Sequence, residues 1–199
     1  MRTIKKVASH IFIDGFGGMT QGLFATLIIG TMIQQIGLLI GGSTGNVIYL
    51  LGKAAAALTS AGIGVGVAVK YGESPLVTVS AAVAAMVGGY AGKITGGTFF
   101  VDGNAVLAGP GEPLGAFIAA FAGITCGHLV SGKTKVDIIV TPVITIGAGS
   151  VVGLLVGPPI SQMMTGLGSI INWATEQRPF IMGIVVSVIQ LSSLRGLLS

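Results

Sequence analysis

The stretch richest in side chains that could bind a small solute is Lys93–Pro113, between two long apolar runs. It carries the carboxylates of Asp102 and Glu112 and the amide of Asn104, next to two consecutive phenylalanines. Sugar sites use carboxylates and amides to exchange hydrogen bonds with hydroxyl groups, with apolar rings alongside. The stretch is either a contact surface for such a ligand or a solvated loop between helices. We take Asp102, Asn104 and Glu112 as candidate substrate-binding residues.

A fourth candidate is His128, near the end of another apolar run. An ionisable residue inside a membrane is a functional candidate by default. However, His128 lies only five residues before Lys133, so a position at the membrane surface is the simpler interpretation.

The segment Gly127–Thr134 matches the phosphate-binding pattern G-x-x-x-x-G-K-[ST]. That pattern works where a strand enters a glycine-rich turn and a helix follows. Here an apolar helix precedes it, so we interpret the segment as a helix end followed by a basic turn. The single cysteine and the two histidines have no metal-ligand spacing. We therefore predict no catalytic residue, no cofactor and no metal in this chain.

The composition indicates what kind of element must position these residues. Of 199 residues, 52% are hydrophobic, 34 are glycine and 8% are charged, whereas about 25% charged residues is usual in a soluble domain. Such a chain cannot cover a water-facing surface, and it is too apolar to be disordered. The net charge of +4 comes from basic residues that are scattered rather than clustered, so no nucleic-acid partner is expected.

The spacing of the charges defines the helices. Six charge-free runs are 16 to 38 residues long, and a membrane-spanning helix needs about 20 apolar residues. The runs lack the alternation of barrel strands. We predict an all-α, polytopic membrane protein with five full spans and a partial sixth. The full spans are expected at Met19–Ile40, Val47–Val69, Leu76–Gly92, Leu114–Ser131 and Val136–Val156, the last kinked at Pro142.

The sequence predicts four parts in the chain. Residues 1–18 form an amphipathic cytoplasmic segment and residues 19–157 a five-helix membrane domain. Gly157-Pro158-Pro159 ends the fifth helix, so residues 158–178 form an amphipathic interfacial segment with Trp173 at the headgroup level. Residues 179–199 form an incomplete sixth span. Lysines and arginines beside the helix ends number six on the N-terminal side and three on the other, so the N-terminus is expected in the cytoplasm.

Small residues recur at every fourth position on three of the predicted helices. Such stripes let helix backbones approach closely in lipid, so we predict tight packing along them. Three glutamines of the first helix should hydrogen-bond across helices, and a role in a transport path stays open. The small residues are Ala84, Gly88 and Gly92; Ala119, Gly123, Gly127 and Ser131; and Gly149, Gly153 and Gly157, and the glutamines are Gln21, Gln34 and Gln35.

Five segments carry a resemblance to a known family. They resemble the bacterial enzyme II C-like membrane components of the phosphoenolpyruvate-dependent sugar phosphotransferase system, and most closely the branch named after the perfringolysin regulator, a toxin regulator. The likeness extends to about Ile189. The segments are Gln21–Gly37, Gly109–Phe117, Asp137–Gly147, Gly153–Ser161 and Arg178–Gly183.

The resemblance implies a multi-pass permease of the bacterial inner membrane that forms homodimers and moves a sugar which cytoplasmic enzyme II A/B-like proteins phosphorylate. The family's sugar-binding histidine and glutamate belong to a second half with no counterpart here, so this chain corresponds to the N-terminal half. Arg195 interrupts the expected sixth helix, which truncation or a frameshift would explain.

Sugar translocation as a permease component is therefore the first functional hypothesis, and in it the phosphate-carrying residue belongs to the partner. A membrane-embedded regulator or sensor without transport activity is the alternative, and an inert remnant is a third possibility.

Overall fold

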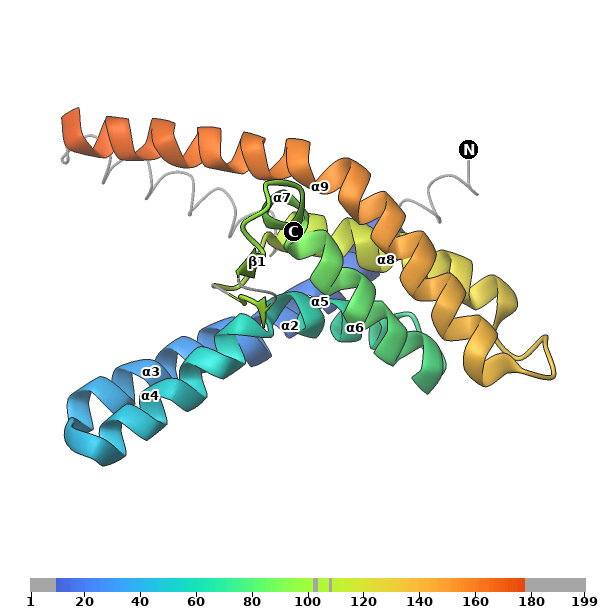
Figure 1. The fold of residues 1–199 in the computed structure, drawn as a ribbon, viewed down its shortest axis with the longest axis horizontal. Helices are drawn as coiled ribbons and strands as arrows, with labels where there is room; N and C mark the ends of the chain where they lie inside the picture. Colours follow the sequence, from blue (N-terminus) through green and yellow to red (C-terminus); the bar gives the residue numbers. More distant parts are fainter. Residues whose placement is uncertain (1–9, 102–103, 108, 178–199) are drawn as a thin grey trace. The chain divides into compact units, whose positions relative to one another are not determined.

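The structure is a computed structural model that describes residues 10–101, 104–107 and 109–177 (Figure 1). The chain divides into two compact units, residues 1–161 and 162–199. The helices and contacts that bear on the candidate site belong to the first unit.

The first helical stretch is continuous from His10 to Ile40. It consists of a π-helix η1 (His10–Gly15), α2 (Phe16–Leu23), a second π-helix η2 (Phe24–Ile28) and α3 (Ile29–Ile40). Residues Ile13–Ile40 are long and apolar enough to cross a membrane. The first predicted span is therefore present, but it starts earlier than Met19, and the described part of the predicted amphipathic segment 1–18 is continuous with it.

The second predicted span is a broken helix. The helices α4 (Gly42–Ala57) and α5 (Thr59–Lys70) meet at Leu58 with a bend of 52°. The Thr59 hydroxyl donates a hydrogen bond to the carbonyl oxygen of Ala56 at 2.6 Å. The two helices together have the length and composition of one span.

The remaining elements follow short turns. Helix α6 (Pro75–Gly89) begins with proline at its first position, where the missing N–H costs nothing. A short helix α7 (Ala91–Thr95) and an antiparallel hairpin follow, in which β1 (Phe100–Val101) pairs with β2 (Asn104–Ala105). Helices α8 (Pro113–Val130) and α9 (Asp137–Gln177) complete the described chain.

The described residues contain three helices that could each cross a membrane, Ile13–Ile40, Pro113–Val130 and Asp137–Ile170, and up to four spans if the bent α4–α5 pair counts as one. Helix α6, where the third span was predicted, has only 15 residues. The all-α membrane class is confirmed, whereas five full spans are not. The predicted sixth span, 179–199, lies outside the described residues.

Helix α9 corrects one boundary. We predicted that Gly157-Pro158-Pro159 ends the fifth helix, but α9 continues through both prolines to Gln177. Proline has a helical φ, but inside a helix it lacks the N–H and its ring crowds the carbonyl of residue i−4. Membrane helices tolerate it where neighbouring groups satisfy the freed carbonyls. Gly157 also packs directly against Ala91, which holds this turn in place. The predicted kink at Pro142 stays a prediction.

The predicted packing of α6, α8 and α9 along small residues is confirmed. A Cβ atom placed on Gly88 would lie 2.5 Å from the carbonyl oxygen of Gly115, and one on Gly149 would lie 2.7 Å from that of Ala119. A Cβ atom on Gly153 would lie 2.8 Å from the Cα atom of Gly88. Real Cβ atoms do not come this close, so only glycine fits at these crossings.

A second glycine seam joins the first two predicted spans, and the sequence analysis missed it. Gly18 and Gly22 on α2 face Gly66 and Gly62 on α5, and Gly30 and Gly37 on α3 face Gly52 and Gly45 on α4. A Cβ atom on Gly18 would lie 2.6 Å from the Gly66 carbonyl oxygen. Both seams keep the helices in backbone contact.

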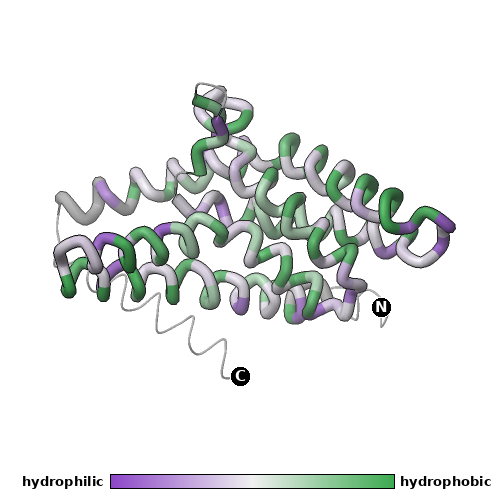
Figure 2. Tube along the Cα trace, turned by 60° about the horizontal axis from the view of Figure 1, so that its bottom comes forward, coloured by the Kyte–Doolittle hydropathy of each residue, from purple (hydrophilic) through white to green (hydrophobic). Residues whose placement is uncertain are grey.

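The core lies between α5, α6 and α8. It contains fully buried aliphatic residues such as Ile63, Val67 and Val77, with Phe117 beside them. Many large apolar side chains instead face outward, including Leu39 at 86% and Leu155 at 72% exposure. Figure 2 shows hydrophobic residues along all of the described helices. An apolar outer surface of this kind suits a lipid environment.

Candidate functional site

The structure places the candidate residues at two ends of α8. Asn104 lies in β2 and Glu112 directly before the first residue of α8, whereas His128 lies in its last turn. A helix of 18 residues is about 27 Å long. His128 therefore does not share a site with the other candidates, and Asp102 lies outside the described residues.

The connection that carries Glu112 is tied to the body of the molecule by backbone groups. The Glu112 N–H donates to the Gly89 carbonyl oxygen at 2.7 Å, and the Ser60 hydroxyl donates to the Pro110 carbonyl oxygen at 2.9 Å. Gly111 has a φ of +74°, and a Cβ atom there would lie 2.5 Å from the Ser60 hydroxyl oxygen. The segment Gly109–Glu112 is thus held against α5 and α6 rather than loose in solvent.

Tyr90 links this segment to the break in the α4–α5 helix. Its hydroxyl donates to the Ala57 carbonyl oxygen at 3.2 Å and also contacts the Gly109 carbonyl oxygen. Its ring is only 1% exposed. A helix break frees backbone carbonyls, which must find donors in an apolar environment. Tyr90 therefore lies where its hydroxyl can serve a carbonyl of the broken helix and can position the connection.

Glu112 is the best-placed carboxylate for binding. It is half-buried at the N-cap position of α8, but its side chain does not cap the helix. Burial raises the pKa of its carboxyl group above the ordinary value, and the positive charge of Lys93 partly opposes this. A carboxyl group in this setting can accept hydrogen bonds from a hydroxylated ligand or bind a proton.

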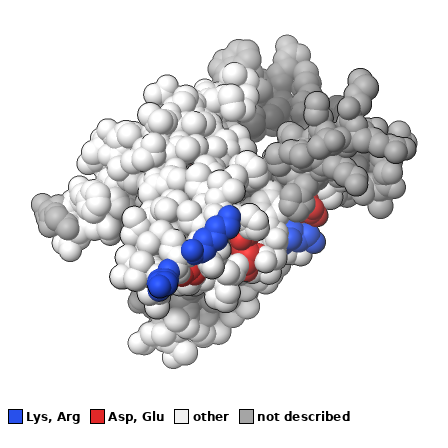
Figure 3. Space-filling model, turned by 90° about the vertical axis from the view of Figure 1, so that its right-hand side faces the viewer, with Lys and Arg blue, Asp and Glu red and all other residues white. Residues whose placement is uncertain are grey.

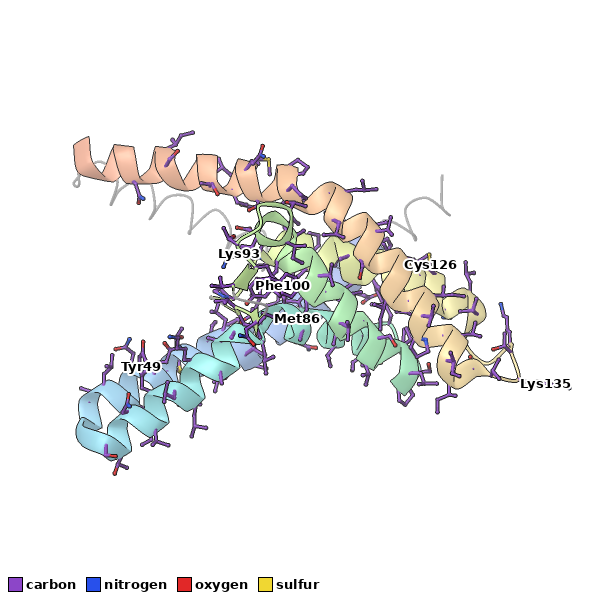
Figure 4. The ribbon with its side chains drawn as sticks, in the orientation of Figure 1. Tyr49, Met86, Lys93, Phe100, Cys126 and Lys135 are labelled. Atoms are coloured by element: carbon purple, nitrogen blue, oxygen red, sulfur yellow. The ribbon has the colours of Figure 1, made fainter. Side chains whose placement is uncertain are left out.

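The same connection carries a cluster of aromatic rings. The Phe99 ring lies 5.4 Å from the Tyr90 ring and 4.9 Å from the Phe100 ring, measured between centroids. The ammonium group of Lys93 lies 5.3 Å from the Tyr90 ring centroid. Figure 4 labels Lys93 and Phe100 in this part of the chain. The connection thus contains a carboxylate, an ammonium group, an amide and rings, which are the group types suited to hydroxyl groups.

His128 belongs to a second polar region at the other end of α8. Its Nδ1 atom lies 3.0 Å from a carboxylate oxygen of Glu73, whose side chain is 9% exposed while that of His128 is 70% exposed. A hydrogen bond of 3.1 Å joins the hydroxyl groups of Ser74 and Ser131 nearby. These contacts join the turn after α5 to the end of α8, so the structure gives His128 a bracing role.

The same end holds most of the described charges. Asp137 accepts hydrogen bonds from the Gly132 N–H at 2.9 Å and from the Thr141 hydroxyl at 2.5 Å. Figure 3 shows acidic and basic side chains in a band on this face, with uncharged residues over the rest of the described surface that this view shows. We call this region the charged end; its charged residues include Lys70, Glu73, Lys133, Lys135 and Asp137.

Sequence reasoning missed Glu73 and Tyr90. Glu73 stands in a short turn with no partner nearby in sequence, and Tyr90 closes an apolar run without any motif around it. Their partners lie 55 residues away for Glu73 and 33 and 19 residues away for Tyr90. Only the tertiary structure brings these groups together.

The phosphate-loop pattern at Gly127–Thr134 has the wrong context for nucleotide binding. Its first residues form the last turn of α8 rather than following a strand. The structure thus supports a helix end and a basic turn. Among the described residues, no group of three or more His, Cys, Asp or Glu side chains could hold a metal ion.

Comparison with known proteins identifies the family. Neither the curated proteins nor the solved structures contain a match to this chain. Residues 13–192 match the family described as "Phosphotransferase system, EIIC". The matched range includes all described residues except 10–12. The chain therefore belongs to the EIIC family of phosphotransferase-system membrane components.

Proposed function

We propose that this chain forms part of the sugar translocation path of a phosphotransferase system. The observation that carries the proposal is the EIIC family match over residues 13–192. The apolar helices support it, since three of them are long enough to cross a membrane. The chain provides the path, and a cytoplasmic protein provides the phosphoryl group.

Within that path, the connection before α8 is the proposed sugar contact. Asp102, Asn104 and Glu112 supply carboxylate and amide groups, and the anchoring of Gly109–Glu112 by Ser60 and Tyr90 supports a preformed surface. A buried carboxyl group near a positive charge is typical of binding sites. His128, at the opposite end of α8, would contact the solute only as the solute leaves the translocation path.

The proposed partners are membrane lipid, a second copy of the chain and enzyme II A/B-like phosphotransfer proteins. The protein lies in the bacterial inner membrane as a multi-pass protein, with its N-terminus in the cytoplasm. The charged end supports this orientation, because Lys70, Lys133 and Lys135 all belong to it and basic residues favour the cytoplasmic side.

The test is accumulation of labelled sugar phosphate in a strain that lacks other sugar permeases, with the chain and its phosphotransfer partners co-expressed. Uptake of at least one sugar from a panel of hexoses and hexitols is expected. Glu112→Gln should lower it by about 10- to 100-fold, because a hydrogen bond to a charged group contributes about 1.5–3 kcal/mol. Glu73→Gln at the charged end is the matched carboxylate control.

Membrane amounts of each variant must be equal for the comparison to hold. The transport proposal fails if no sugar in the panel accumulates as its phosphate. The assignment of Glu112 fails if Glu112→Gln and Glu73→Gln leave uptake equally intact.

A further inference from the structure

The antiparallel pair of α3 and α4 has two chemically different sides. The helices touch through Gly30 and Gly37 on α3 and through Gly45 and Gly52 on α4. In an antiparallel pair of right-handed helices, the residue after each contact residue points to the same side of the pair. On that side lie amide, hydroxyl and ammonium groups. We call it the polar face; it consists of Thr31, Gln34, Gln35, Asn46, Tyr49 and Lys53.

Most of the polar face is open. Thr31, Gln35, Asn46 and Lys53 are exposed, and Gln34 and Tyr49 are half-buried. The Gln34 side chain lies along the contact with Gly52, and its amide nitrogen donates to the Gly30 carbonyl oxygen at 3.4 Å. Leu38, which follows the contact residue Gly37, also lies on this side, and Leu50 borders it. Figure 4 labels Tyr49 on this pair of helices.

The residues that precede the contact positions form the opposite side, which is aliphatic. It exposes Ile29 by 47%, Ile36 by 50% and Leu51 by 62%. Such a side suits lipid tails. The pair is therefore amphipathic across its width, although both helices are apolar in composition.

Lys53 makes contact between the polar face and lipid energetically unfavourable. It lies eleven residues after Gly42, the first residue of α4, which is about 16 Å along the helix. A lysine near the centre of a membrane helix costs about 2.5–3.5 kcal/mol on insertion scales. The polar face must therefore meet water, a polar solute or an anionic partner.

A second copy of the chain is a poor partner for this face. The sequence contains no aspartate or glutamate between Asp14 and Glu73. Two such faces in contact would bury Lys53 against amides without a counter-charge, which is strongly unfavourable. Water avoids that cost, because it solvates the ammonium group.

We infer that the polar face lines a water-filled part of the translocation path and contacts the hydroxyl groups of the passing solute. Amide and hydroxyl side chains both donate and accept hydrogen bonds, and the Tyr49 ring offers a flat apolar surface. The identity of the solute rests on the proposed function, whereas the presence of water does not.

Cysteine accessibility tests the inference in the full-length chain. Gln35→Cys, Asn46→Cys and Tyr49→Cys are made in a Cys126→Ser background and treated with a negatively charged, membrane-impermeant methanethiosulfonate in opened membrane vesicles. Ile29→Cys, Ile36→Cys and Leu51→Cys are the matched controls from the aliphatic side. The polar-face positions should react about 100-fold faster than the controls, because a thiol in hydrocarbon stays protonated and unreactive.

Lys53 provides a second readout at Tyr49→Cys, since residues four apart are neighbours on a helix. The negatively charged reagent should react about fivefold faster with Lys53 present than in Lys53→Gln, as a single charge contributes about 1 kcal/mol at 4 Å in water, and a positively charged reagent should show the opposite change.

Three results would overturn the inference. Equal reaction on both sides would place the helix pair outside the membrane. Absence of reaction on the polar face would mean that lipid or protein covers it, and oxidative cross-linking through Tyr49→Cys would identify a second copy as the cover. If the labelling pattern holds while no sugar is taken up, the proposed function fails and the water-lined face stands.

Discussion

At the residue scale, Tyr90 connects more of this fold than any candidate chosen from the sequence. Its hydroxyl group meets the last carbonyl of α4 and the Gly109 carbonyl, and its ring supports Phe99 and Lys93. Glu112 follows three residues after Gly109. The proposed sugar contact therefore depends on a tyrosine that need not touch the sugar.

Tyr90→Phe should lower the free energy of unfolding by about 1–3 kcal/mol, because it leaves buried carbonyl groups without a donor. Denaturant titration in detergent, followed by circular dichroism, measures this. Tyr49→Phe is the control and should change stability by less than about 0.5 kcal/mol, as expected for a more exposed position. Equal effects of the two substitutions would contradict the role given to Tyr90.

Glu112 predicts a pH dependence of stability. Burial raises the pKa of its carboxyl group in the folded state above its ordinary value of 4.5, so the folded state holds the proton more tightly than the unfolded state. The resulting contribution to stability is complete below pH 4.5 and declines as the pH rises through the folded pKa.

Unfolding of wild type and Glu112→Gln between pH 4 and pH 8 checks this, the range chosen to extend about 3.5 pH units above the ordinary value. The wild type should lose stability relative to the variant as the pH rises. A stability difference that stays constant over the range would show that the carboxyl group is not perturbed by folding.

At the element scale, glycine sets the distances between helices. One seam joins α6, α8 and α9, and another joins the first helical stretch to α4 and α5. Lipid provides no hydrophobic drive between helices, so close backbone contact supplies the association energy. The helices therefore have little freedom to take larger residues at the crossings.

Gly153→Ala should destabilise the protein by more than about 2 kcal/mol, because the new methyl group would overlap Gly88 and Ala119. Gly147→Ala in the same helix has open space around it and should stabilise by about 0.5–1 kcal/mol through helix propensity. Denaturant titration measures the free energy of unfolding of the two variants. A Gly153→Ala protein as stable as Gly147→Ala would show that α9 does not pack as described.

At the scale of the whole molecule, the connections between helices fall into two groups according to their contacts. The turn after α5 and the turn after α8 lie together at the charged end, joined by Glu73–His128 and Ser74–Ser131. The connection that carries Glu112 joins α8 at its opposite end, the N-terminal one. This separation agrees with a path that has one entrance on each side of the membrane.

We expect the charged end in the cytoplasm. Thr134→Cys should therefore react with a membrane-impermeant thiol reagent only in inside-out vesicles, and Ser43→Cys in the first turn of α4 should react in intact cells, both in a Cys126→Ser background. The opposite pattern at either position would reverse the orientation or change the number of spans.

The sequence by itself determined the class of protein and the helix-packing stripes. Charge-free runs of 16 residues or more can only be helices in lipid, because every backbone group must be satisfied within its own segment. The same logic made Gly88 and Gly153 packing residues. Both are local properties, so they can be read from spacing alone.

The tertiary structure decided what depends on distant contacts. The bend at Leu58 lies beside Tyr90, whose hydroxyl is within hydrogen-bonding distance of the Ala57 carbonyl oxygen. Helix α9 continues through two prolines although each removes an N–H donor, which membrane helices tolerate where neighbouring groups satisfy the freed carbonyls. His128 meets Glu73, which lies 55 residues away along the chain, only in the folded molecule. Spacing along the chain predicts which residues share a helix face, whereas the partner of a lone hydroxyl or carboxylate depends on the folded backbone.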